Sequence, residues 1–251
     1  MDNENPIIVT EELTKIYKGR VAVDHLSFTV KEGEIFGFLG PNGAGKTTTL
    51  LMLLGLTEPT SGRLRVMGLD PVREPIKVKS KVGYLQENMG FYPDLNARQM
   101  LRFVAELNGM AGREADPRID AALETVGLAD ESAKKIIAFS RGMRQRLGIA
   151  ELLIKDSRVA FLDEPTLGLD PDATLRIMEL IEGLARQKRM TILLSSHQLH
   201  QVQKLCHRVG IMIKGRLVAS GTMDQLAREK FGLGHEEFTL EEIYMKYFME
   251  A

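Results

Sequence analysis

The sequence predicts an α/β fold with a buried parallel sheet, and three observations support this expectation. The segments 158–165 (RVAFLDEP) and 191–197 (TILLSSH) are short and apolar, and the segment 172–187 between them has apolar residues at helical spacing. Such a strand–helix–strand unit pairs its two strands in parallel. A glycine-rich turn at 40–45 joins another strand-like segment to a helix-like one. Finally, the chain changes from strand-like to helical segments near residue 94, which indicates a separate helical unit.

The remaining elements follow the same patterns in chain order. The first third contains short strand-like segments separated by turns rich in glycine, aspartate and lysine, at 7–13, 23–30, 34–40 and 62–68. The middle of the chain contains helical segments with glycine or proline between them, at 95–110, 115–128 and 142–156. Two further helices are expected at 223–232 and 238–251. We expect the last one to pack on the body of its own domain, although its apolar residues could instead contact a partner.

The composition is that of an ordinary globular protein and argues against several classes. With a formal net charge of −1 over 251 residues and no clustered basic excess, no nucleic-acid partner is expected. The single cysteine, Cys206, excludes an internal disulfide framework and is typical of a reducing compartment. No apolar run approaches the roughly 20 residues that a membrane-spanning helix needs. The acidic N-terminus also lacks the core of a signal peptide. We therefore expect a cytoplasmic chain, unless a partner holds it at a membrane.

The segment Gly40–Thr47 (GPNGAGKT) matches the pattern G-x-x-x-x-G-K-[ST] without a mismatch. It follows the strand-like EIFGFL and opens the helix-like KTTTLLMLLGL, which is the context that the pattern requires. The glycines let successive backbone N–H groups form an anion-binding nest, and the helix start adds free donors and its dipole. Lys46 can reach the β- and γ-phosphates of a nucleotide, and the Thr47 hydroxyl can ligate Mg²⁺. The residues predicted to bind the nucleotide here are Gly40, Pro41, Asn42, Gly43, Ala44, Gly45, Lys46, Thr47 and Thr48.

Two acidic residues, Asp163 and Glu164, follow directly after a buried strand. They are expected at the carboxyl edge of the parallel sheet, where ligands of open α/β sheets bind. Asp163 is the natural partner of Mg²⁺, through water, because Mg²⁺ keeps several waters and few carboxylates. Glu164 is then free to position or deprotonate the attacking water. His197 ends the next strand, so we expect it at the same edge and in contact with the γ-phosphate.

The segment 140–146 (SRGMRQR) places three arginines in the first turns of a predicted helix. The N-terminal end of a helix is the positive end of its dipole, so cations there cost up to about 1 kcal/mol each. An anion bound nearby would relieve this cost. The alternative is that the arginines are solvated or pair with acids such as Glu151.

Five segments occur in a recognisable order: GPNGAGKTT, YLQEN, SRGMRQR, FLDEPTLGLDP and SSH. In this order they resemble the ATP-binding cassette (ABC) ATPases over nearly the whole chain. The resemblance implies a RecA-like P-loop NTPase core with an antiparallel β subdomain and an inserted α-helical subdomain. It divides the single domain into a nucleotide-binding core with the β subdomain at 1–87 and 156–225, a helical subdomain at 88–155, and a C-terminal helical extension at 226–251.

Further roles follow from the resemblance, position by position. Tyr17 resembles the aromatic residue that stacks on adenine. Gln86 resembles the loop glutamine that joins Mg²⁺ and moves with the helical subdomain. Asp170 resembles the aspartate that communicates across the dimer interface, and His197 resembles the switch histidine.

The residues 139–143 (FSRGM) occupy the position of the family's signature, usually Leu-Ser-Gly-Gly-Gln, and are called the signature segment below. In that family the signature of one subunit clamps the γ-phosphate that is held by the phosphate loop of the other subunit. Ser140 and Gly142 keep the pattern, whereas Phe139, Arg141 and Met143 depart from it. The resemblance therefore implies that the anion near the arginines is ATP bound to a partner chain.

The function implied by the resemblance is that of an ATP-hydrolysing subunit of an ABC transporter, with ATP and Mg²⁺ as cofactors. One phosphate loop and one signature mean that two complete sites need two chains, in a homodimer or a heterodimer with a related ATPase. A separate transmembrane permease would hold the pair at the inner face of the membrane. The signature and the C-terminal segment are most similar to the multidrug or ABC-2-type exporter branch. Two alternatives stay open: a soluble ATPase of a cytosolic assembly or repair machine, and a nucleotide sensor that hardly hydrolyses ATP.

Overall fold

The computed structural model describes residues 6–232 and 238–250, and it confirms the predicted α/β fold. A six-stranded sheet forms the centre, in the order β5-β6-β7-β3-β8-β9; the first five strands are parallel, and β9 pairs antiparallel with β8. The strands are β3 (Ile35–Leu39), β5 (Val82–Leu85), β6 (Val159–Asp163), β7 (Thr191–Ser196), β8 (Arg208–Ile213) and β9 (Arg216–Gly221). Every residue of β3, β6 and β7 is buried, as expected for strands covered on both faces.

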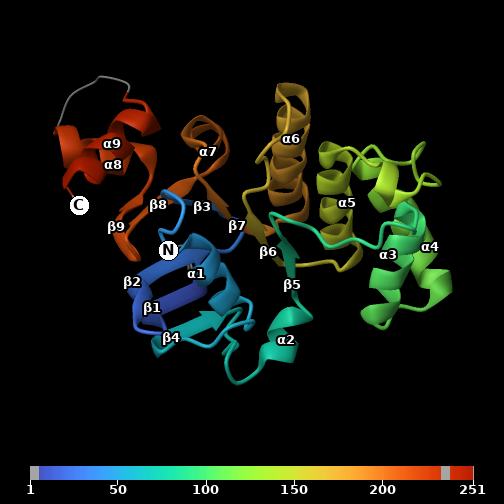
Figure 1. Ribbon diagram of the computed structural model, residues 1–251, viewed down its shortest axis with the longest axis horizontal. Helices are drawn as coiled ribbons and strands as arrows, with labels where there is room; N and C mark the ends of the chain where they lie inside the picture. Colours follow the sequence, from blue (N-terminus) through green and yellow to red (C-terminus); the bar gives the residue numbers. More distant parts are fainter. Residues whose placement is uncertain (1–5, 233–237, 251) are drawn as a thin grey trace.

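A three-stranded antiparallel sheet lies beside the first one (Figure 1), in the order β2-β1-β4. Its strands are β1 (Pro6–Tyr17), β2 (Arg20–Lys31) and β4 (Ser61–Val66). Aromatic rings join the two sheets, because Phe28 of β2 meets Phe38 of β3 edge to face, with 4.8 Å between ring centroids. Helix α1 (Lys46–Leu53) contributes Leu50 and Met52 to the same apolar core. The antiparallel sheet therefore holds the start of α1 in place.

Three helices form one end of the molecule (Figure 1): α3 (Ala97–Leu107), α4 (Gly112–Thr125) and α5 (Arg141–Ile154), with a short 3-10 helix (Ile136–Ala138) before α5. Helix α3 begins at a capping box, in which the side chains of Asn96 and Gln99 each accept the other's backbone N–H. Helix α4 ends against α5, because Arg146 donates to the carbonyl oxygens of Val126 at 2.9 Å and Gly127 at 2.6 Å. A positive charge thus closes the negative end of the α4 dipole.

The remaining helices are α2 (Pro75–Lys79), α6 (Pro171–Lys188), α7 (Leu199–Leu205), α8 (Met223–Phe231) and α9 (Leu240–Glu250). Helices α8 and α9 lie at the opposite end of the molecule from α3 to α5 (Figure 1). The expectation that the last helix packs on its own domain is confirmed, since Leu240 and Ile243 are fully buried. Met249 stays exposed, and Ala251, the end of the predicted helix, lies outside the described residues. No helix in the described parts of the chain is both long and apolar enough to cross a membrane.

Several elements were not expected from the sequence, namely β5, β8, β9 and α2. The two strands β8 and β9 form a hairpin whose turn, Lys214–Gly215, has φ values of +50° and +87°. Two successive positive φ angles are the mark of a two-residue turn that matches the twist of the strands. Strand β1 also runs on to Tyr17, well past the predicted end at residue 13, because an irregularity near Glu12 (φ +48°) shifts its register without ending the pairing.

Candidate nucleotide-binding site

The loop between β3 and α1 has backbone conformations that require glycine. Gly40 and Gly45 have φ values of +155° and +104°. A Cβ atom at Gly40 would lie 2.3 Å from the Met212 carbonyl oxygen, and one at Gly45 would lie 2.5 Å from that of Ala22. Both neighbours are backbone atoms that cannot turn aside. The loop is therefore packed tightly at the start of α1, where the first backbone N–H groups have no partner within the helix.

Lys46 is the first residue of α1, and only 6% of it is exposed. Its Nζ donates to the carbonyl oxygens of Gly40 at 2.7 Å and Pro41 at 3.2 Å, both in the loop itself. It also lies 3.7 Å from the Glu164 Oε1 atom. Burial lowers the pKa of the Lys46 ammonium, although the carboxylates of Glu164 and Asp163 oppose this effect. The loop thus presents a buried cation that is held mainly by neutral carbonyls.

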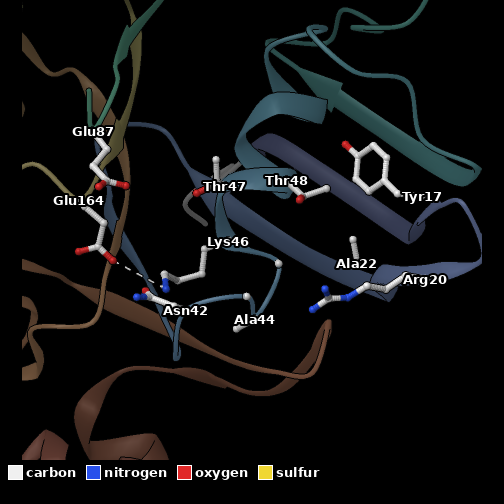
Figure 2. A pocket seen from close by; sticks show the side chains of 12 residues that line it. Tyr17, Arg20, Ala22, Asn42, Ala44, Lys46, Thr47, Thr48, Glu87 and Glu164 are labelled. Carbon is white, nitrogen blue, oxygen red and sulfur yellow. Dashed lines mark ion pairs between the residues drawn. The ribbon is translucent and has the colours of Figure 1, made fainter. Parts of the chain in front are cut away.

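A cavity of about 370 Å³ lies over the loop and the start of α1 (Figure 2). It is lined by Tyr17, Arg20, Ala22, Asn42, Gly43, Ala44, Gly45, Lys46, Thr47, Thr48, Glu87 and Glu164. Tyr17 and Arg20 lie at one end of the cavity, whereas Lys46, Glu87 and Glu164 gather at the other. The cavity thus has an aromatic ring at one end and the buried Lys46 at the other, which suits a nucleotide with its base and its phosphates.

Three of these lining residues were missed from the sequence: Arg20, Ala22 and Glu87. Arg20 and Ala22 belong to the start of β2, which the fold brings next to the loop. No sequence motif marks these two residues. Glu87 directly follows Gln86 in YLQEN, but Gln86 itself is exposed and is not part of the lining. Gly40 and Pro41 of the predicted set are not among the lining residues, but their carbonyls hold Lys46.

Asp163, at the end of β6, is 3% exposed and surrounded by hydroxyl groups. Its Oδ1 accepts from the Thr47 hydroxyl at 3.1 Å and from the Ser195 hydroxyl at 2.5 Å. Tyr84 of β5 lies near Asp163 as well. Burial, together with the nearby charge of Asp163, raises the pKa of Tyr84 to about 12. Thr47 and Asp163 are thus brought together as predicted, and Tyr84 and Ser195 are neighbours that the sequence did not reveal.

Glu164 follows Asp163 with a φ of +49°, a left-handed conformation that is uncommon outside glycine. It is 7% exposed, and its Oε2 lies 2.9 Å from Nδ1 of His197. Neither carboxylate oxygen accepts a well-directed hydrogen bond from the described residues. Glu164 is therefore an acid enclosed between two basic side chains, Lys46 and His197, with both of its oxygens able to accept a further donor.

The oxygen atoms at this edge of the sheet fit Mg²⁺, which takes hard oxygen ligands. Within residues 6–232 and 238–250, no three His, Cys, Asp or Glu side chains converge on a metal site. Mg²⁺ that binds with a nucleotide needs no such cluster, because it uses one or two protein oxygens and otherwise phosphate oxygens and water. Thr47 and Asp163 provide that small set. The carboxylate of Glu164, whose oxygens accept no hydrogen bond from the described residues, adds further oxygen atoms at this edge.

The signature segment does not line this cavity. Ser140 caps α5 by accepting the N–H of Met143 at 3.2 Å, and Asp170 caps α6 by accepting the N–H of Ala173 at 2.8 Å. The two helix starts are neighbours, since a Cβ atom on Gly142 would lie 3.2 Å from that of Ala173. The residues predicted to act across a dimer interface therefore form a second group, separate from the cavity.

The three arginines of SRGMRQR have different surroundings. Arg146 closes the end of α4, as described above. Arg141 covers Gly168, where an added Cβ atom would lie 2.8 Å from a guanidinium nitrogen. Arg144 reaches only a carbonyl of the preceding turn, at 3.5 Å. The alternative pairing with Glu151 is wrong, because Oε1 of Glu151 is enclosed without a partner among the described residues. Burial raises the pKa of Glu151 to about 7.

The glycine loop, the buried lysine and the acids at the carboxyl edge of a parallel sheet define a P-loop nucleotide-binding protein. The family model described as "ABC transporter" matches residues 23–167. The bacitracin transport ATP-binding protein BcrA of Bacillus licheniformis is 43% identical over 222 residues, which cover 88% of this chain and 72% of that protein. The linearmycin resistance ATP-binding protein LnrL of Bacillus subtilis is 37% identical over 220 residues, which cover 88% of this chain and 70% of that protein.

Solved structures agree with this family. The ATP-binding subunit of an ABC transporter superposes with a TM-score of 0.85 at 28% identity, and the match covers 96% of this chain and 99% of that one. CbiO1 from Clostridium perfringens, part of the ABC transporter complex CbiONQ, superposes with a TM-score of 0.80 at 27% identity and covers 99% of this chain and 100% of that one. The chain belongs to the ABC transporter family, as its ATP-binding subunit. It binds ATP with Mg²⁺ and hydrolyses it.

Proposed function

We propose that this chain powers an exporter by acting on a separate transmembrane permease, and that it works at the inner face of the membrane. Two similar proteins are named for antibiotic handling, BcrA for bacitracin transport and LnrL for linearmycin resistance. CbiO1, with a similar fold, is part of a multi-subunit transporter complex. The chain itself supplies the nucleotide chemistry, so the cargo is selected elsewhere in the complex.

The cavity supports a defined role for each residue at its two ends. Tyr17 stacks on the adenine, and the loop from Gly40 to Thr48 wraps the phosphates with backbone N–H groups. Lys46 exchanges its loop carbonyls for the β- and γ-phosphates. When bound, Mg²⁺ supplies positive charge against these phosphates, and Thr47 and Asp163 would hold it. We assign Gln86 to the same metal once its loop moves toward the cavity.

Hydrolysis relies on Glu164, which orients the attacking water and accepts its proton. The carboxylate suits this role because it is buried and both of its oxygens lack hydrogen-bond donors from the described residues. His197, 2.9 Å from Glu164, is placed to hold the γ-phosphate and the carboxylate in one arrangement. Lys46 and His197 together stabilise the charge that develops on the transferred phosphate.

Two chains complete the two sites in a head-to-tail dimer, in which Ser140 and the N–H groups near Gly142 clamp the γ-phosphate bound by the partner. The observation that carries this proposal is the separation of the signature segment from the cavity of its own chain. Ser140 stands at the start of α5, so the dipole of a 14-residue helix faces outward there. Asp170, at the start of α6 beside it, links the two sites.

The separation of the signature segment from the cavity also supports a division of the chain into subdomains that move relative to one another. We assign 1–87 and 156–225 to the nucleotide-binding core with its β subdomain, 88–155 to the helical subdomain, and 226–251 to a C-terminal extension. The closed dimer binds ATP more tightly than the open one, and this difference in affinity is what can drive a change in the permease.

Sedimentation of Glu164→Gln protein with ATP and Mg²⁺ tests the dimer. We expect a stable dimer, because ATP closes the two chains and the slow hydrolysis step leaves them closed. The double variant Glu164→Gln with Lys46→Ala is the matched control and should stay monomeric. Tight ATP binding by a Glu164→Gln protein that remains monomeric at high concentration would contradict the proposal.

The membrane partner is tested by purifying tagged Glu164→Gln protein from its own cells in mild detergent and identifying the co-purifying proteins by mass spectrometry. A polytopic membrane protein in a stoichiometric amount is the expected result. Recovery of a soluble partner alone, with nothing from the membrane fraction, would instead favour an assembly ATPase of the same family.

A further inference from the structure

Ser195 lies at a point where both acidic residues of the site can be held. It is fully buried on β7 and stands opposite Asp163 in the parallel pairing of β6 with β7. Its hydroxyl donates to Oδ1 of Asp163 at 2.5 Å. The same hydroxyl accepts the backbone N–H of Glu164 at 3.3 Å, and the carbonyl oxygen of Ser195 accepts that N–H at 3.1 Å. One residue therefore contacts the side chain of one acid and the backbone of the next.

The backbone contact bears on Glu164 because its left-handed conformation needs support. A non-glycine residue with positive φ costs on the order of 1 kcal/mol or more and persists only where the surroundings hold it. At Glu164, with φ +49°, the holding group is Ser195, whose two oxygens share the N–H. This conformation directs the Glu164 carboxylate toward Lys46 and His197.

The side-chain contact bears on Asp163. In this structure the Thr47 and Ser195 hydroxyls both donate to the same oxygen, Oδ1. A Thr47 hydroxyl that ligates Mg²⁺ offers its lone pair to the metal, and its own contact with Asp163 changes. The Ser195 hydroxyl is buried beneath the acid and cannot reach the cavity, so its bond persists through this change. Tyr84 contacts Asp163 as well, from β5 on the other side of β6.

We propose that Ser195 is a positioning residue, which fixes the Asp163 carboxylate for Mg²⁺ and holds the Glu164 backbone in the conformation needed for hydrolysis. This inference rests on the roles proposed above for Asp163 and Glu164. Hydrogen bonds behind a metal ligand fix its orientation, and their loss costs 10- to 100-fold in metal affinity or activity. Ser195 acts through the two acids and does not itself touch the nucleotide.

The neighbouring serine offers a matched control. Ser196 is also buried on β7, but its hydroxyl accepts the backbone N–H of Gln198 at 3.0 Å and is not bonded to either acid. Ser195→Ala and Ser196→Ala therefore remove the same atom from adjacent positions in one strand. A purely structural effect of losing a buried hydroxyl would affect both variants.

The test measures the affinity of the protein for Mn²⁺, a spectroscopic substitute for Mg²⁺. Binding is followed by electron paramagnetic resonance on protein that is saturated with a non-hydrolysable ATP analogue. We expect Ser195→Ala to weaken Mn²⁺ binding about 10- to 100-fold, with the affinity for the nucleotide in EDTA changed less than about twofold. Ser196→Ala should match the parent chain. ATP turnover by Ser195→Ala is measured separately. It should stay below that of the parent chain even at saturating Mg²⁺, because the substitution also removes a hydrogen bond to the Glu164 backbone.

Unchanged Mn²⁺ binding in a folded Ser195→Ala protein would overturn the inference. If that variant does not fold, as judged by its melting transition, Ser195→Cys keeps nearly the same volume with a weak donor and should show the same loss. Asp163→Asn distinguishes failure of the proposed metal-binding role of Asp163 from failure of the positioning role of Ser195. If Asp163→Asn binds Mn²⁺ normally, the proposed role of Asp163 fails; if only Ser195→Ala does, the positioning role of Ser195 fails.

Discussion

The cavity and the signature segment are built in opposite ways within one chain. At the cavity, Lys46, Asp163 and Glu164 are each no more than 7% exposed and are held by hydrogen bonds or ion pairs within the protein. At the signature segment, Ser140 and Arg141 are exposed, and the helix start has only its own cap. The contrast teaches that the candidate nucleotide cavity is preassembled, whereas the signature segment, which we propose to clamp the nucleotide of a partner chain, is left open to solvent. A complete site, in our proposal, combines one part from each of two chains.

The largest expected effect comes from mixing two inactive variants. Lys46→Ala removes the cation of the cavity, and Gly142→Asp places a negative charge at the signature segment. Each variant alone should be nearly inactive as an ATPase. If sites are shared between chains, only the mixed dimer carries an intact site, and it carries one of two. Turnover should therefore return in the equimolar mixture, to about a quarter of the parent value where the chains pair at random.

Steady-state phosphate release measures this recovery directly. Each variant is also mixed with a chain carrying both substitutions, which cannot provide an intact site and should restore nothing. An equimolar mixture of the two single variants that stays inactive, although both bind or dimerise as expected, would mean that each chain hydrolyses ATP without the partner's signature segment.

A smaller effect concerns the pH dependence of stability that Glu151 contributes in the helix of the signature segment. The pKa of Glu151 on α5 is raised from 4.5 to about 7 by burial, so the folded chain binds its proton more tightly than the unfolded chain does. The contribution of this group to stability is therefore full below about pH 4.5 and is lost as the pH rises toward 7 and above. Glu151→Gln should remove this dependence.

Urea unfolding at pH 5 and pH 8 measures the difference. Between these two values, the parent chain should lose on the order of 2 kcal/mol more of its free energy of unfolding than Glu151→Gln does. The control is Glu179→Gln, at an exposed acid on α6, whose pH dependence should follow that of the parent chain. Identical pH dependence in the parent and in Glu151→Gln would show that folding does not raise the pKa of this carboxyl group.

The aromatic end of the cavity should contribute a change of about tenfold. Tyr17 is 43% exposed, and within the described part of the chain its side chain contacts only Lys15 and Thr57, so its ring is accessible to a base. Tyr17→Ala should weaken ATP binding about tenfold, within the range measured for base–aromatic stacking, and Tyr17→Phe should not. The chain has no tryptophan, so Tyr17→Trp gives a single reporter whose fluorescence should change on adding ATP. Equal affinities for all variants would place the base elsewhere.

The smallest effect separates the arginines of the signature region from one another. Arg146→Ala leaves the carbonyls of Val126 and Gly127 without their donor and should cost about 1–2 kcal/mol of the free energy of unfolding. Arg144→Ala removes only a contact at 3.5 Å and should change stability by less than about 0.5 kcal/mol. Thermal and urea unfolding measure both. Equal losses would mean that the closure of α4 by Arg146 contributes nothing specific.

The sequence predicted the fold class and the parts of the site that depend on local chemistry. The phosphate loop was predictable because Gly40 and Gly45 are required by their own backbone angles and neighbours, which a short pattern records. The pairing of Thr47 with Asp163 was predictable in kind, because parallel strands end at a common edge. The proposed roles of Gln86 and of the signature segment remain predictions.

Other neighbours could not be predicted because strand order brings them together. Ser195 and Tyr84 reach Asp163 only because β7 and β5 flank β6, and nothing in the spacing of these residues reveals that order. Glu87 lines the cavity while Gln86 beside it does not, a distinction that depends on the course of one loop. The hydrogen-bond partners of Arg146 likewise depend on where α4 ends. The helical pattern of the sequence defines that end only to within a few residues.

The pairing of β6 with β7 sets Asp163 opposite Ser195, and each strand is buried on both faces. Side chains alternate between the faces of a sheet, so moving either strand by one residue would turn these two away from each other. The pairing of the two strands therefore sets the distance between Ser195 and Asp163, and with it the position of the carboxylate that we propose as a Mg²⁺ ligand. A single residue added within β6 or β7 would break this alignment, and it would also turn the buried side chains that follow it toward the opposite face of the sheet.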